Sequence, residues 1–518
     1  MPGDMNKEPE CFTELDHFAI DEGSVRLLNY KFCMQNCVVV LDVVDPDGQD
    51  SVTIGVLDPE EAKLVDQIEK ILSRPIKPVR LSEYEIKKAI KIGYAKYETH
   101  HEKLKLALQP IQKISFDPDL SVAHQIDEIL GRAISLKASD VHIECYEDDV
   151  DVRFRIDGIL HQVNTPIQKD NVASVVSRLK ILSDLDISEK RAAQDGRVCA
   201  TFEIGKEVRP IDFRLSVLPG PFGEDAVLRI LDSEKPAIGL DELGLPKYIL
   251  TQFREMIKNP EGMILVTGPT GSGKTTTLYS GLQEVKSVKV KILTVEDPIE
   301  YIIPKVNQKQ VGPRMNFADY ARSFLRQDPD IMMIGEIRDE ETADVALRAA
   351  QTGHLVLGTL HTNDSVGTIS RLKVLGLNAS LIADSLLCAL SQRLVRRICN
   401  KCKTKTEPDN LAKATFKRLG HSFRLFNGEG CEECHRTGYR GRVGIYEFFF
   451  NSQEIADMIS ADVLGHKIRQ FAKARGMRSL FDDALNKIKA GITTFSELQR
   501  TVPYEIINEP MVRLPKRG

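Results

Sequence analysis

The stretch EGMILVTGPTGSGKTTTLYSGLQEV, residues 261–285, joins an apolar run to a glycine-rich turn and then to a segment with helical spacing. A strand, a glycine turn and a helix in this order are typical of a phosphate-binding loop. Gly268, Gly271 and Gly273 let the backbone curl so that its N–H groups face an anion, and the helix N-terminus adds partial positive charge. A structural turn is the alternative, but a chance match is expected in only roughly two of a hundred such chains. The stretch therefore predicts a nucleotide site.

The side chains of this loop have the chemistry for phosphate and for metal. Lys274 would reach the β- and γ-phosphates, and the Thr275 hydroxyl would bind Mg²⁺. The predicted nucleotide-binding residues of the loop are Gly268, Pro269, Thr270, Gly271, Ser272, Gly273, Lys274, Thr275 and Thr276.

Two further apolar runs end in acidic residues. The run IMMIG is followed by Glu336, and the run ILTV is followed by Glu296, Asp297 and Glu300. An acid at the end of a neighbouring strand would hold Mg²⁺ or its water, and another could accept a proton from the attacking water of a hydrolysis. Acids in loops often only cap strand ends, but several of them beside one phosphate loop favour a functional role.

Basic residues occur in the two segments that follow these strands. Arg322 and Arg326 lie four residues apart and would share one face of a helix. Near a phosphate they could neutralise transition-state charge, in this chain or in a neighbouring subunit, although a solvated surface pair is the alternative. His354 and His361 flank the apolar run LVLGTL, where a structural histidine is the alternative to a functional one.

Length and composition restrict the class of protein. The 518 residues suggest three or four domains, and the net charge of −5 gives no reason to expect nucleic-acid binding. The first residues lack the apolar core of a secretory signal, and the sequence has no apolar run of 18 residues. We therefore expect a cytoplasmic protein that does not span a membrane.

The patterns along the chain predict an α/β protein with several domains. Short β-type runs around one helical stretch predict a small N-terminal α+β domain over residues 1–100, followed by a polar linker over 101–120. Residues 121–236 predict a second α+β domain, and a segment rich in Pro and Gly at 231–246 predicts a hinge. From residue 237 to 518 the order of β-run, turn and helix recurs, which predicts a core with a parallel sheet.

Four of the ten cysteines are grouped in two CxxC pairs, within a region of about residues 395–440. Chance would supply about 0.2 such pairs in a chain of this composition. Four thiolates at this spacing suit a closed structural zinc site, formed by Cys399, Cys402, Cys431 and Cys434. Disulfides are one alternative, and a zinc ribbon that contacts nucleic acid is another, because the segment RLVRRICNKCKTK is basic.

The motifs together resemble those of the secretion ATPases of type II secretion and type IV pilus systems. GPTGSGKTTT, TVEDPIEY, RQDPDIMMIGEIRD and TGHLVLGTLHTND look like the Walker A, Asp box, Walker B and His box of that family. ASDVHIE, VRFRIDGIL and QDGRV resemble its second N-terminal domain, and GMRSLFDDALNKIKAGITTFSELQR resembles its helical C-terminal tail. The resemblance implies a RecA-like P-loop ATPase core, a preceding PAS-like domain and a small N-terminal docking domain.

The resemblance also implies roles for individual residues. Glu300 would be the general base, Glu336 would organise Mg²⁺ and water, and His354 and His361 would complete the γ-phosphate site. Three arginines of the second domain would reach the nucleotide when that domain closes on the core: Arg197, Arg214 and Arg229.

The tetracysteine element and the long N-terminal region resemble the assembly branch of the family. The implied protein is a cytoplasmic homo-hexamer that uses ATP, Mg²⁺ and Zn²⁺. It would act at the inner membrane with a platform protein and other assembly proteins, to extend a type IV pilus. A type II secretion ATPase is the alternative, and a DNA-translocating ATPase or a nucleotide-gated scaffold ranks lower. The cyclic di-GMP-binding motif of some members is not recognisable.

Overall fold

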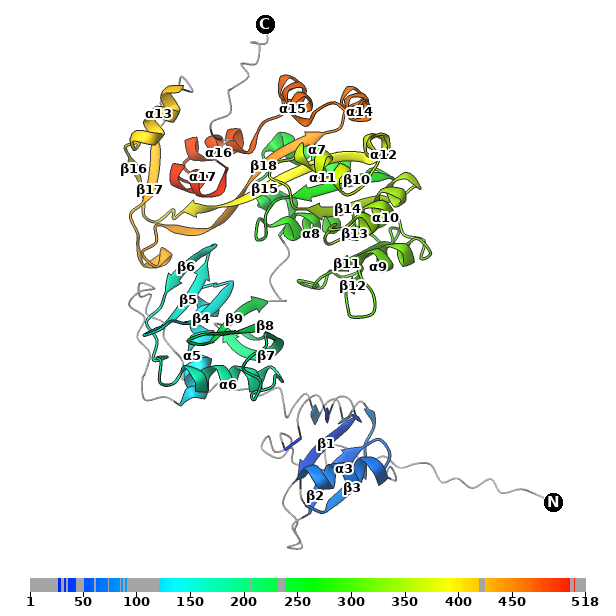
Figure 1. Cartoon of the computed structure of the whole chain (residues 1–518), viewed down its shortest axis with the longest axis vertical. Coiled ribbons are helices and arrows are strands. Elements are labelled where there is room, and N and C mark those ends of the chain that lie inside the picture. The colour runs from blue at the N-terminus through cyan, green and yellow to red at the C-terminus, as the bar shows by residue number, and fades with distance from the viewer. Residues whose placement is uncertain are drawn as a thin grey trace, which may run out of the picture. The chain divides into compact units, whose positions relative to one another are not determined.

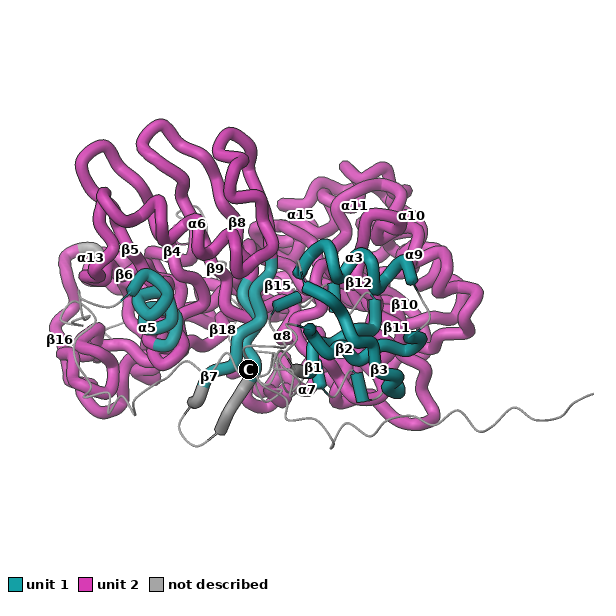
Figure 2. Tube along the Cα trace, turned by 90° about the horizontal axis from the view of Figure 1, so that it is seen from below, with its two compact units in different colours: residues 1–105, 121–131, 197–213 teal, residues 106–120, 132–196, 214–518 magenta. Residues whose placement is uncertain are grey.

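The structure is a computed structural model, and it describes residues 27–28, 32–33, 36–42, 51–59, 62–72, 74–83, 85–86, 89–90, 121–204, 207–231, 238–418, 424–503 and 507. The chain forms two compact units, coloured teal and magenta in Figure 2. The first comprises residues 1–105, 121–131 and 197–213, and the second comprises 106–120, 132–196 and 214–518. The predicted linker at 101–120 and residues 232–237 of the predicted hinge lie outside the described residues.

A three-stranded sheet forms the core of the N-terminal region (Figure 1). Strand β1 (Val38–Asp42) is antiparallel to β2 (Val52–Val56), and β2 is parallel to β3 (Ile76–Arg80). Parallel neighbours need a crossover connection, which helix α3 (Ala62–Leu72) supplies by packing Leu64 and Ile68 into the core. This is the α+β arrangement that the sequence predicted.

A six-stranded sheet follows, in the order β6-β5-β4-β9-β8-β7. Its strands and the two helices of this region are α5 (Val122–Ser135), β4 (Asp140–Cys145), β5 (Val150–Ile156), β6 (Ile159–Gln162), α6 (Val172–Leu182), β7 (Gln194–Ile204), β8 (Glu207–Gly220) and β9 (Gly223–Leu231). In β5, buried Val150, Val152 and Phe154 alternate with more exposed polar residues. One face of such a sheet is apolar and the other polar, as the alternating pattern predicted.

The largest sheet has seven strands in the order β12-β11-β13-β14-β10-β15-β18. All the pairs whose register the structure gives are parallel except β15 with β18. The strands are β10 (Gly262–Thr267), β11 (Ile292–Glu296), β12 (Asn307–Gln310), β13 (Ile331–Ile334), β14 (Leu355–Leu360), β15 (Leu386–Ile398) and β18 (Tyr439–Phe450). Two helices precede β10, namely η3 (Leu240–Leu243) and α7 (Lys247–Met256). Those between the strands are α8 (Lys274–Val285), α9 (Phe317–Phe324), α10 (Glu340–Gln351), α11 (Gly367–Val374) and α12 (Ala379–Ser385).

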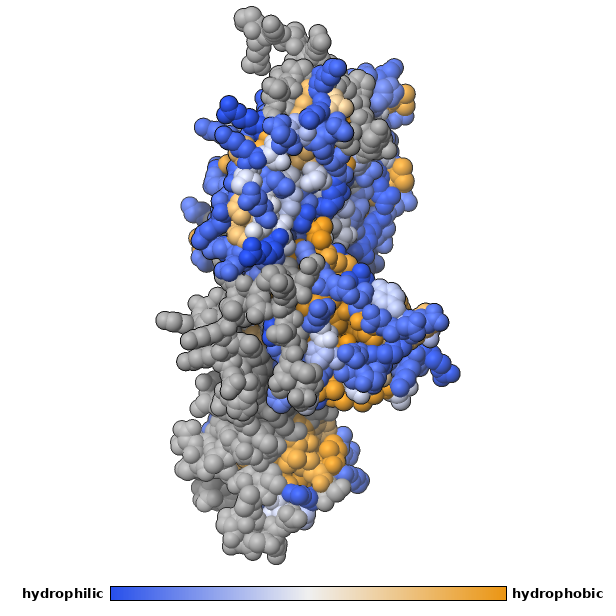
Figure 3. All heavy atoms as spheres, turned by 90° about the vertical axis from the view of Figure 1, so that its left-hand side faces the viewer, coloured by the Kyte–Doolittle hydropathy of each residue, from blue (hydrophilic) through white to orange (hydrophobic). Residues whose placement is uncertain are grey.

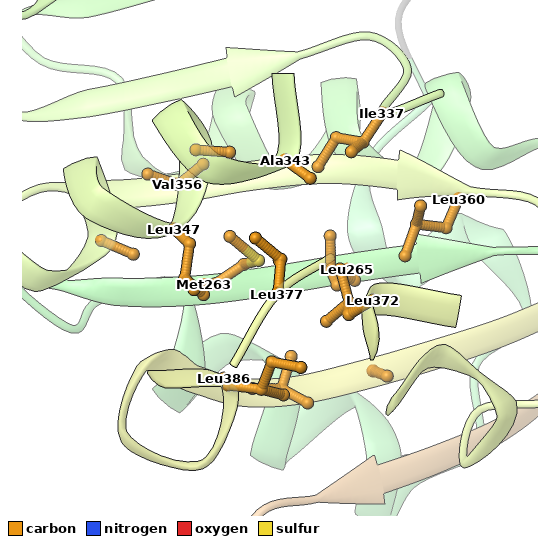
Figure 4. Close-up of a cluster of buried hydrophobic side chains, with 14 of the residues drawn as sticks. Met263, Leu265, Ile337, Ala343, Leu347, Val356, Leu360, Leu372, Leu377 and Leu386 are labelled. Atoms are coloured by element: carbon orange, nitrogen blue, oxygen red, sulfur yellow. The ribbon is translucent and has the colours of Figure 1, made fainter. Parts of the chain in front are cut away.

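Both faces of the seven-stranded sheet are covered by apolar side chains. Strand β10 is buried along its whole length, because Met263 and Leu265 pack on one face while Ile264 and Val266 pack on the other. Figure 4 shows the first of these clusters, where Met263 and Leu265 lie among side chains from neighbouring helices, Leu347 of α10 included. Continuous apolar strands are what a parallel sheet covered on both sides requires, and the predicted parallel core is confirmed.

The region after β15 contains a small pair of strands, five α-helices and one short 3-10 helix among the described residues. The elements are β16 (Lys403–Thr406), α13 (Asn410–Arg418), β17 (Leu425–Gly428), η4 (Glu432–Cys434), α14 (Gln453–Ser460), α15 (Gly465–Ala474), α16 (Leu480–Lys489) and α17 (Phe495–Thr501). Strands β16 and β17 are antiparallel. Leu480, Leu485 and Leu498 of the last two helices pack with Ile445 of β18 in one apolar cluster. The expected helical C-terminal tail is therefore docked on the ATPase-like core.

The described part of the face in Figure 3 is mainly hydrophilic in the upper half of the view, while apolar residues form larger continuous patches in the lower half. Among the helices that the structure describes, none has the length and apolar character needed to cross a membrane.

A buried ion cluster fastens α17 to β15. Glu497 is 1% exposed, and its carboxylate accepts hydrogen bonds from the backbone N–H of Arg396 at 2.8 Å, from Arg396 Nη2 at 2.8 Å and from Arg500 Nη2 at 2.7 Å. Burial raises the pKa of Glu497, but the hydrogen bonds from Arg500 and Arg396 outweigh it and lower the pKa to about 2.

We expect Glu497→Gln to lower the free energy of unfolding at neutral pH by about 3 kcal/mol, because the native pKa lies well below the ordinary value. A depressed carboxylate pKa stabilises the fold above the unfolded-state pKa, and this stabilisation is lost as pH falls through the native value. The difference between the two proteins should therefore shrink between about pH 5 and pH 2. Urea unfolding at a series of pH values measures it, and a difference that does not change with pH would contradict the assignment.

Candidate nucleotide site

The loop between β10 and α8 has the backbone of an anion cradle. Gly271 and Gly273 have φ of 75° and 88°, in the left-handed region that favours glycine. A Cβ at Gly273 would also lie 2.8 Å from Gln392 Nε2. Helix α8 begins directly afterwards at Lys274, so its free N–H groups point to the space enclosed by the loop.

Two polar side chains of the loop are available to a ligand. Lys274 Nζ donates to the carbonyl oxygens of Gly268 at 2.9 Å and Pro269 at 3.2 Å. Burial lowers the pKa of Lys274, so an anion that replaced these carbonyls would favour the charged ammonium. The Ser272 hydroxyl is buried and has no hydrogen-bond partner among the described residues. Thr275 lies in the first turn of α8 and is half-buried. This donor set fits a nucleotide phosphate chain.

Gln392 of β15 lies against the phosphate loop and the helix that follows it. Its Oε1 accepts a hydrogen bond from Thr277 Oγ1 of α8 at 2.7 Å, and both residues are buried. The Gln392 carbonyl oxygen would lie 2.4 Å from a Cβ placed on Gly268. Sequence reasoning missed this residue, although the polar triplet Ser391–Arg393 that interrupts the apolar run of β15 is a usable signal.

Glu336 follows β13 and lies between two basic side chains. Its Oε2 accepts from Arg338 Nη2 at 2.6 Å, and its Oε1 lies 3.2 Å from His361 Nε2. Burial raises the pKa of Glu336, but the hydrogen bond from Arg338 and the charges of Arg338, His361 and Lys274 outweigh it and place the pKa below the ordinary value. The structure therefore brings Glu336, His361 and Lys274 together, and it adds Arg338, which the sequence reasoning did not single out.

The three acids after β11 have different environments. Glu296 is 2% exposed and accepts hydrogen bonds from Thr294 Oγ1 at 2.5 Å, from Gln308 Nε2 at 3.1 Å and from the Tyr279 hydroxyl. Its burial raises its pKa. Asp297 and Glu300 are exposed. Glu296 is thus occupied by protein donors, whereas Glu300 keeps a carboxylate open to water.

The same network attaches the Glu300 backbone to the phosphate-loop helix. The Glu300 N–H donates to the Tyr279 hydroxyl at 3.4 Å, and Gln308 Nε2 donates to that hydroxyl at 3.2 Å. Tyr279 is fully buried on α8. A shift of α8 would therefore move the backbone that carries Glu300.

The structure separates the two predicted histidines. His361 follows β14 at the phosphate-loop edge, but His354 precedes β14, and its carbonyl accepts from Gly262 N at 3.1 Å at the opposite end of β10. A six-residue strand is about 20 Å long, so within this chain His354 does not meet Lys274. Its ring Nδ1 lies 3.0 Å from the Ala349 carbonyl oxygen. The role at the γ-phosphate that the resemblance implies for His354 stays a prediction.

The predicted arginine pair is only partly helical. Helix α9 ends at Phe324, so Arg326 lies beyond it, and Arg326 Nη1 donates to the Arg322 carbonyl at 3.4 Å. The Arg322 guanidinium contacts the Glu341 carboxylate and lies 3.5 Å from Asp319. Arg322 therefore joins α9 to the start of α10 in this chain.

The arginines of the six-stranded sheet are paired within that sheet or half-buried on it. Arg197 donates to Asp212 at 2.7 Å, and Arg229 Nε lies 3.0 Å from Asp140. Arg214 is half-buried on β8 between buried neighbours. The Arg197 and Arg229 side chains are still 63% and 61% exposed, so a stronger anion could draw them away from their acids.

The four grouped cysteines form one cluster. Their Sγ atoms all lie within 4.8 Å of one another, with Cys399–Cys431 and Cys402–Cys434 at 3.8 Å and Cys431–Cys434 at 3.7 Å. Disulfides need about 2.0 Å, and every cysteine that the structure describes is free. A tetrahedron of sulfurs about 2.3 Å from a zinc ion has edges of about 3.8 Å. The donor set therefore fits a closed zinc site.

Comparison with known proteins agrees with these features. Residues 117–500 match the family described as Type II/IV secretion system protein, and residues 11–94 match the MshEN domain. The Type II secretion system ATPase E of Vibrio cholerae is 44% identical over 387 residues, which cover 74% of this chain and 76% of that protein. The Type IV pilus assembly ATPase PilB of Myxococcus xanthus is 39% identical over 504 residues, which cover 93% of this chain and 87% of that protein.

Among solved structures, the ATPase DotB of Legionella pneumophila is similar with a TM-score of 0.55 at 23% identity, over 74% of this chain and 97% of that one. This likeness concerns the fold.

Replacement of Gln392 by Ala should weaken nucleotide binding about tenfold and lower stability by about 1–3 kcal/mol, because the buried Thr277 hydroxyl loses its acceptor. The double variant Thr277→Val/Gln392→Leu removes both polar partners and should recover much of the stability. Calorimetric titration with nucleotide and thermal unfolding measure the two effects, with Gln453→Ala on the exposed start of α14 as the control. Equal instability of the single and double variants would show that this hydrogen bond is not the cause.

Proposed function

The chain belongs to the family of type II/IV secretion system proteins and is an ATPase of its secretion and pilus-assembly group, and we propose that it uses ATP hydrolysis to extend a type IV pilus. The observation that carries the catalytic part of this proposal is the meeting of Lys274, Glu336 and His361 at one edge of the sheet, where Glu336 Oε1 lies 3.2 Å from His361 Nε2.

The residues of the site divide the work of hydrolysis. The loop N–H groups and Lys274 bind the phosphates. Thr275 and Glu336 would hold Mg²⁺, which would supply positive charge against the phosphate oxygens. Glu300 is exposed and keeps its carboxylate open, so it serves as the base that accepts a proton from the attacking water. Glu296 cannot take that role because Thr294, Gln308 and Tyr279 already occupy its oxygens.

Two pilus-assembly relatives align over more of this chain than the secretion relative does, which supports the pilus, while another pilus-assembly ATPase, PilB of Acinetobacter baylyi, aligns over 73% of it. Two pilus-assembly ATPases, PilB of Myxococcus xanthus and TfpB of Acinetobacter baylyi, align over 93% and 92% of this chain. The type II secretion ATPase of Vibrio cholerae aligns over 74%. Agreement over the additional part of the chain supports a shared partner there. Type II secretion is the alternative, since that relative is 44% identical over the 387 residues that align.

The working form in this proposal is a homo-hexamer at the cytoplasmic face of the inner membrane. Closure of the second domain on the core would bring Arg197, Arg214 and Arg229 to the nucleotide, with Arg322, Arg326 and His354 acting across subunits. Loss of the γ-phosphate contacts after hydrolysis then lets the domains relax, and this movement drives a membrane platform protein.

Replacing Glu336 with Gln should leave ATP binding within about threefold of wild type and lower kcat at least about a hundredfold, because the amide binds Mg²⁺ poorly and cannot organise the water. Phosphate release and nucleotide titration measure the two quantities. In the source organism, a strain that lacks the gene should lose surface pili, and the Glu336→Gln gene should not restore them.

Other outcomes of these experiments identify the alternatives. Normal turnover in the variant would remove Glu336 from the mechanism, and absence of turnover in the wild type would leave a nucleotide-gated scaffold. A deletion strain that keeps its pili but fails to secrete proteins would favour type II secretion. Stimulation of turnover by DNA would favour a DNA-translocating ATPase.

Protein purified under reducing conditions should contain about one zinc ion per chain, because the four thiolates form one closed site. Cys431→Ser should lower this content and destabilise the β16–β17 hairpin, which the metal would connect to the ends of β15 and β18. Elemental analysis and thermal unfolding with and without a chelator measure both effects, and Cys199→Ser, at an exposed position outside the cluster, serves as the control. Metal-free wild-type protein of unchanged stability would refute the zinc site.

A further inference from the structure

The loop that follows His361 is held by four different parts of the fold. Residues 362–365 are called the His-loop below. Thr362 is joined to the last residue of β10, since its carbonyl oxygen accepts from Thr267 Oγ1 at 3.2 Å and the two hydroxyl oxygens are 2.5 Å apart. This contact ties the His-loop to the strand that leads into the phosphate loop.

The next three residues are bound by titratable side chains from β15, α15 and β18. Arg393 Nη2 donates to the Asn363 carbonyl at 3.0 Å, and Arg469 Nη2 lies 2.7 Å from Asp364 Oδ1. Ser365 donates both its N–H, at 2.9 Å, and its hydroxyl, at 2.6 Å, to Glu447 Oε1. We refer to Arg393, Glu447 and Arg469 as the three anchors.

Two of the anchors are deeply buried, which is unusual for charged residues. Glu447 is 1% exposed and Arg393 is 6% exposed. Removing such groups from water is costly unless hydrogen bonds compensate. Arg393 Nη1 has no hydrogen-bond partner in the part of the chain that the structure describes. Packing alone would be served as well by apolar residues, so the chemistry of these anchors points to a function for the His-loop.

His361 itself has little support from packing. Its side chain is 43% exposed, and its Nε2 lies 3.2 Å from Glu336 Oε1. A half-exposed ring is positioned by the backbone that carries it, and this backbone enters the His-loop directly. A small shift of the His-loop would therefore separate His361 from Glu336.

We infer that Glu447, with Arg393 and Arg469, is a positioning residue that holds the His-loop so that His361 stays beside Glu336. The inference rests on the proposed ATP hydrolysis for its effect on rate, but the fixed position of the His-loop does not. Within the described residues, none of the anchors makes a hydrogen bond to the phosphate loop or to the acids of the site. The charge of Arg393 also lowers the pKa of Lys274, but Glu447 has no such direct effect and acts through the His-loop on His361. The C-terminal elements β18 and α15 thereby belong to the support of the nucleotide site.

A double-mutant cycle tests the action through His361. Glu447→Ala should lower kcat roughly ten- to hundredfold with KM within about threefold, because a misplaced group loses rate more than binding. In a His361→Ala background the same change should lower kcat by less than about threefold. Ser365→Ala removes the hydroxyl and keeps the N–H, so it should show the same pattern more weakly. It replaces Glu447→Ala in the cycle if the Glu447→Ala protein does not fold. Equal losses of kcat in both backgrounds would overturn the inference.

Hydrogen–deuterium exchange tests the position of the loop without turnover. Peptides that cover residues 361–367 should exchange at least about tenfold faster in Glu447→Ala than in wild type. Glu497→Gln is the matched control, because Glu497 is also a carboxylate with 1% exposure but binds Arg396 and Arg500 and not the His-loop. It should lower stability while changing kcat and exchange at 361–367 much less than Glu447→Ala does. Unchanged exchange in Glu447→Ala would overturn the inference. A wild type without turnover would refute the proposed function, and the exchange measurement alone would then decide whether Glu447 holds the His-loop.

Discussion

The site depends on the parallel pairing of β10 with its neighbours. Residues of β10, β14 and β15 are in fixed register, so Thr267 lies opposite Leu360 and Ser391. Since parallel strands end at the same edge, the phosphate loop after β10, His361 after β14 and Glu336 after β13 all emerge there. The sheet alone therefore places all of these residues at one edge. The apolar side chains on both faces of these strands, such as Met263 and Ile264, hold the register and thereby the distances between catalytic groups.

Buried polar groups at this edge fix the positions of the loops, which apolar packing alone does not do. On β15, Gln392 and Arg393 are consecutive and so point to opposite faces. Gln392 supports Thr277 of the phosphate-loop helix, and Arg393 supports the Asn363 carbonyl. One strand therefore serves both sides of the nucleotide site. Such groups are tolerated because each makes directional hydrogen bonds, and those bonds allow only one arrangement of the loops around them.

The sequence predicted the parts of the site whose signal is local. The phosphate loop, the acids at strand ends and the two CxxC pairs each lie within a few residues, and the parallel core follows from the apolar strands between helices. Residues that act across the fold had no such signal. Gln392 is 115 residues from Thr277, and Glu447 is 82 residues from Ser365, so only the folded register brings them together. His354 shows the reverse relation between sequence and distance. It is only seven residues from His361 in sequence, but the full length of β14 separates the two residues in the fold.

The antiparallel strands β15 and β18 connect the cysteine cluster to the nucleotide site. Ser391 is opposite Glu447 and Gln392 is opposite Tyr446, while the same ladder continues to Ile398 opposite Tyr439, next to Cys399. The Cys399 N–H donates to the Gly438 carbonyl at 3.0 Å, which closes this end of the ladder. A metal bound by the four thiolates would stop the two strands from separating at that end. Fraying of the ladder would loosen Gln392 and Glu447 together, because a β-ladder opens from its ends. With a metal bound, the cysteines, which lie far along the chain from the phosphate loop, would therefore help to fix the residues on which Thr277 and Ser365 depend.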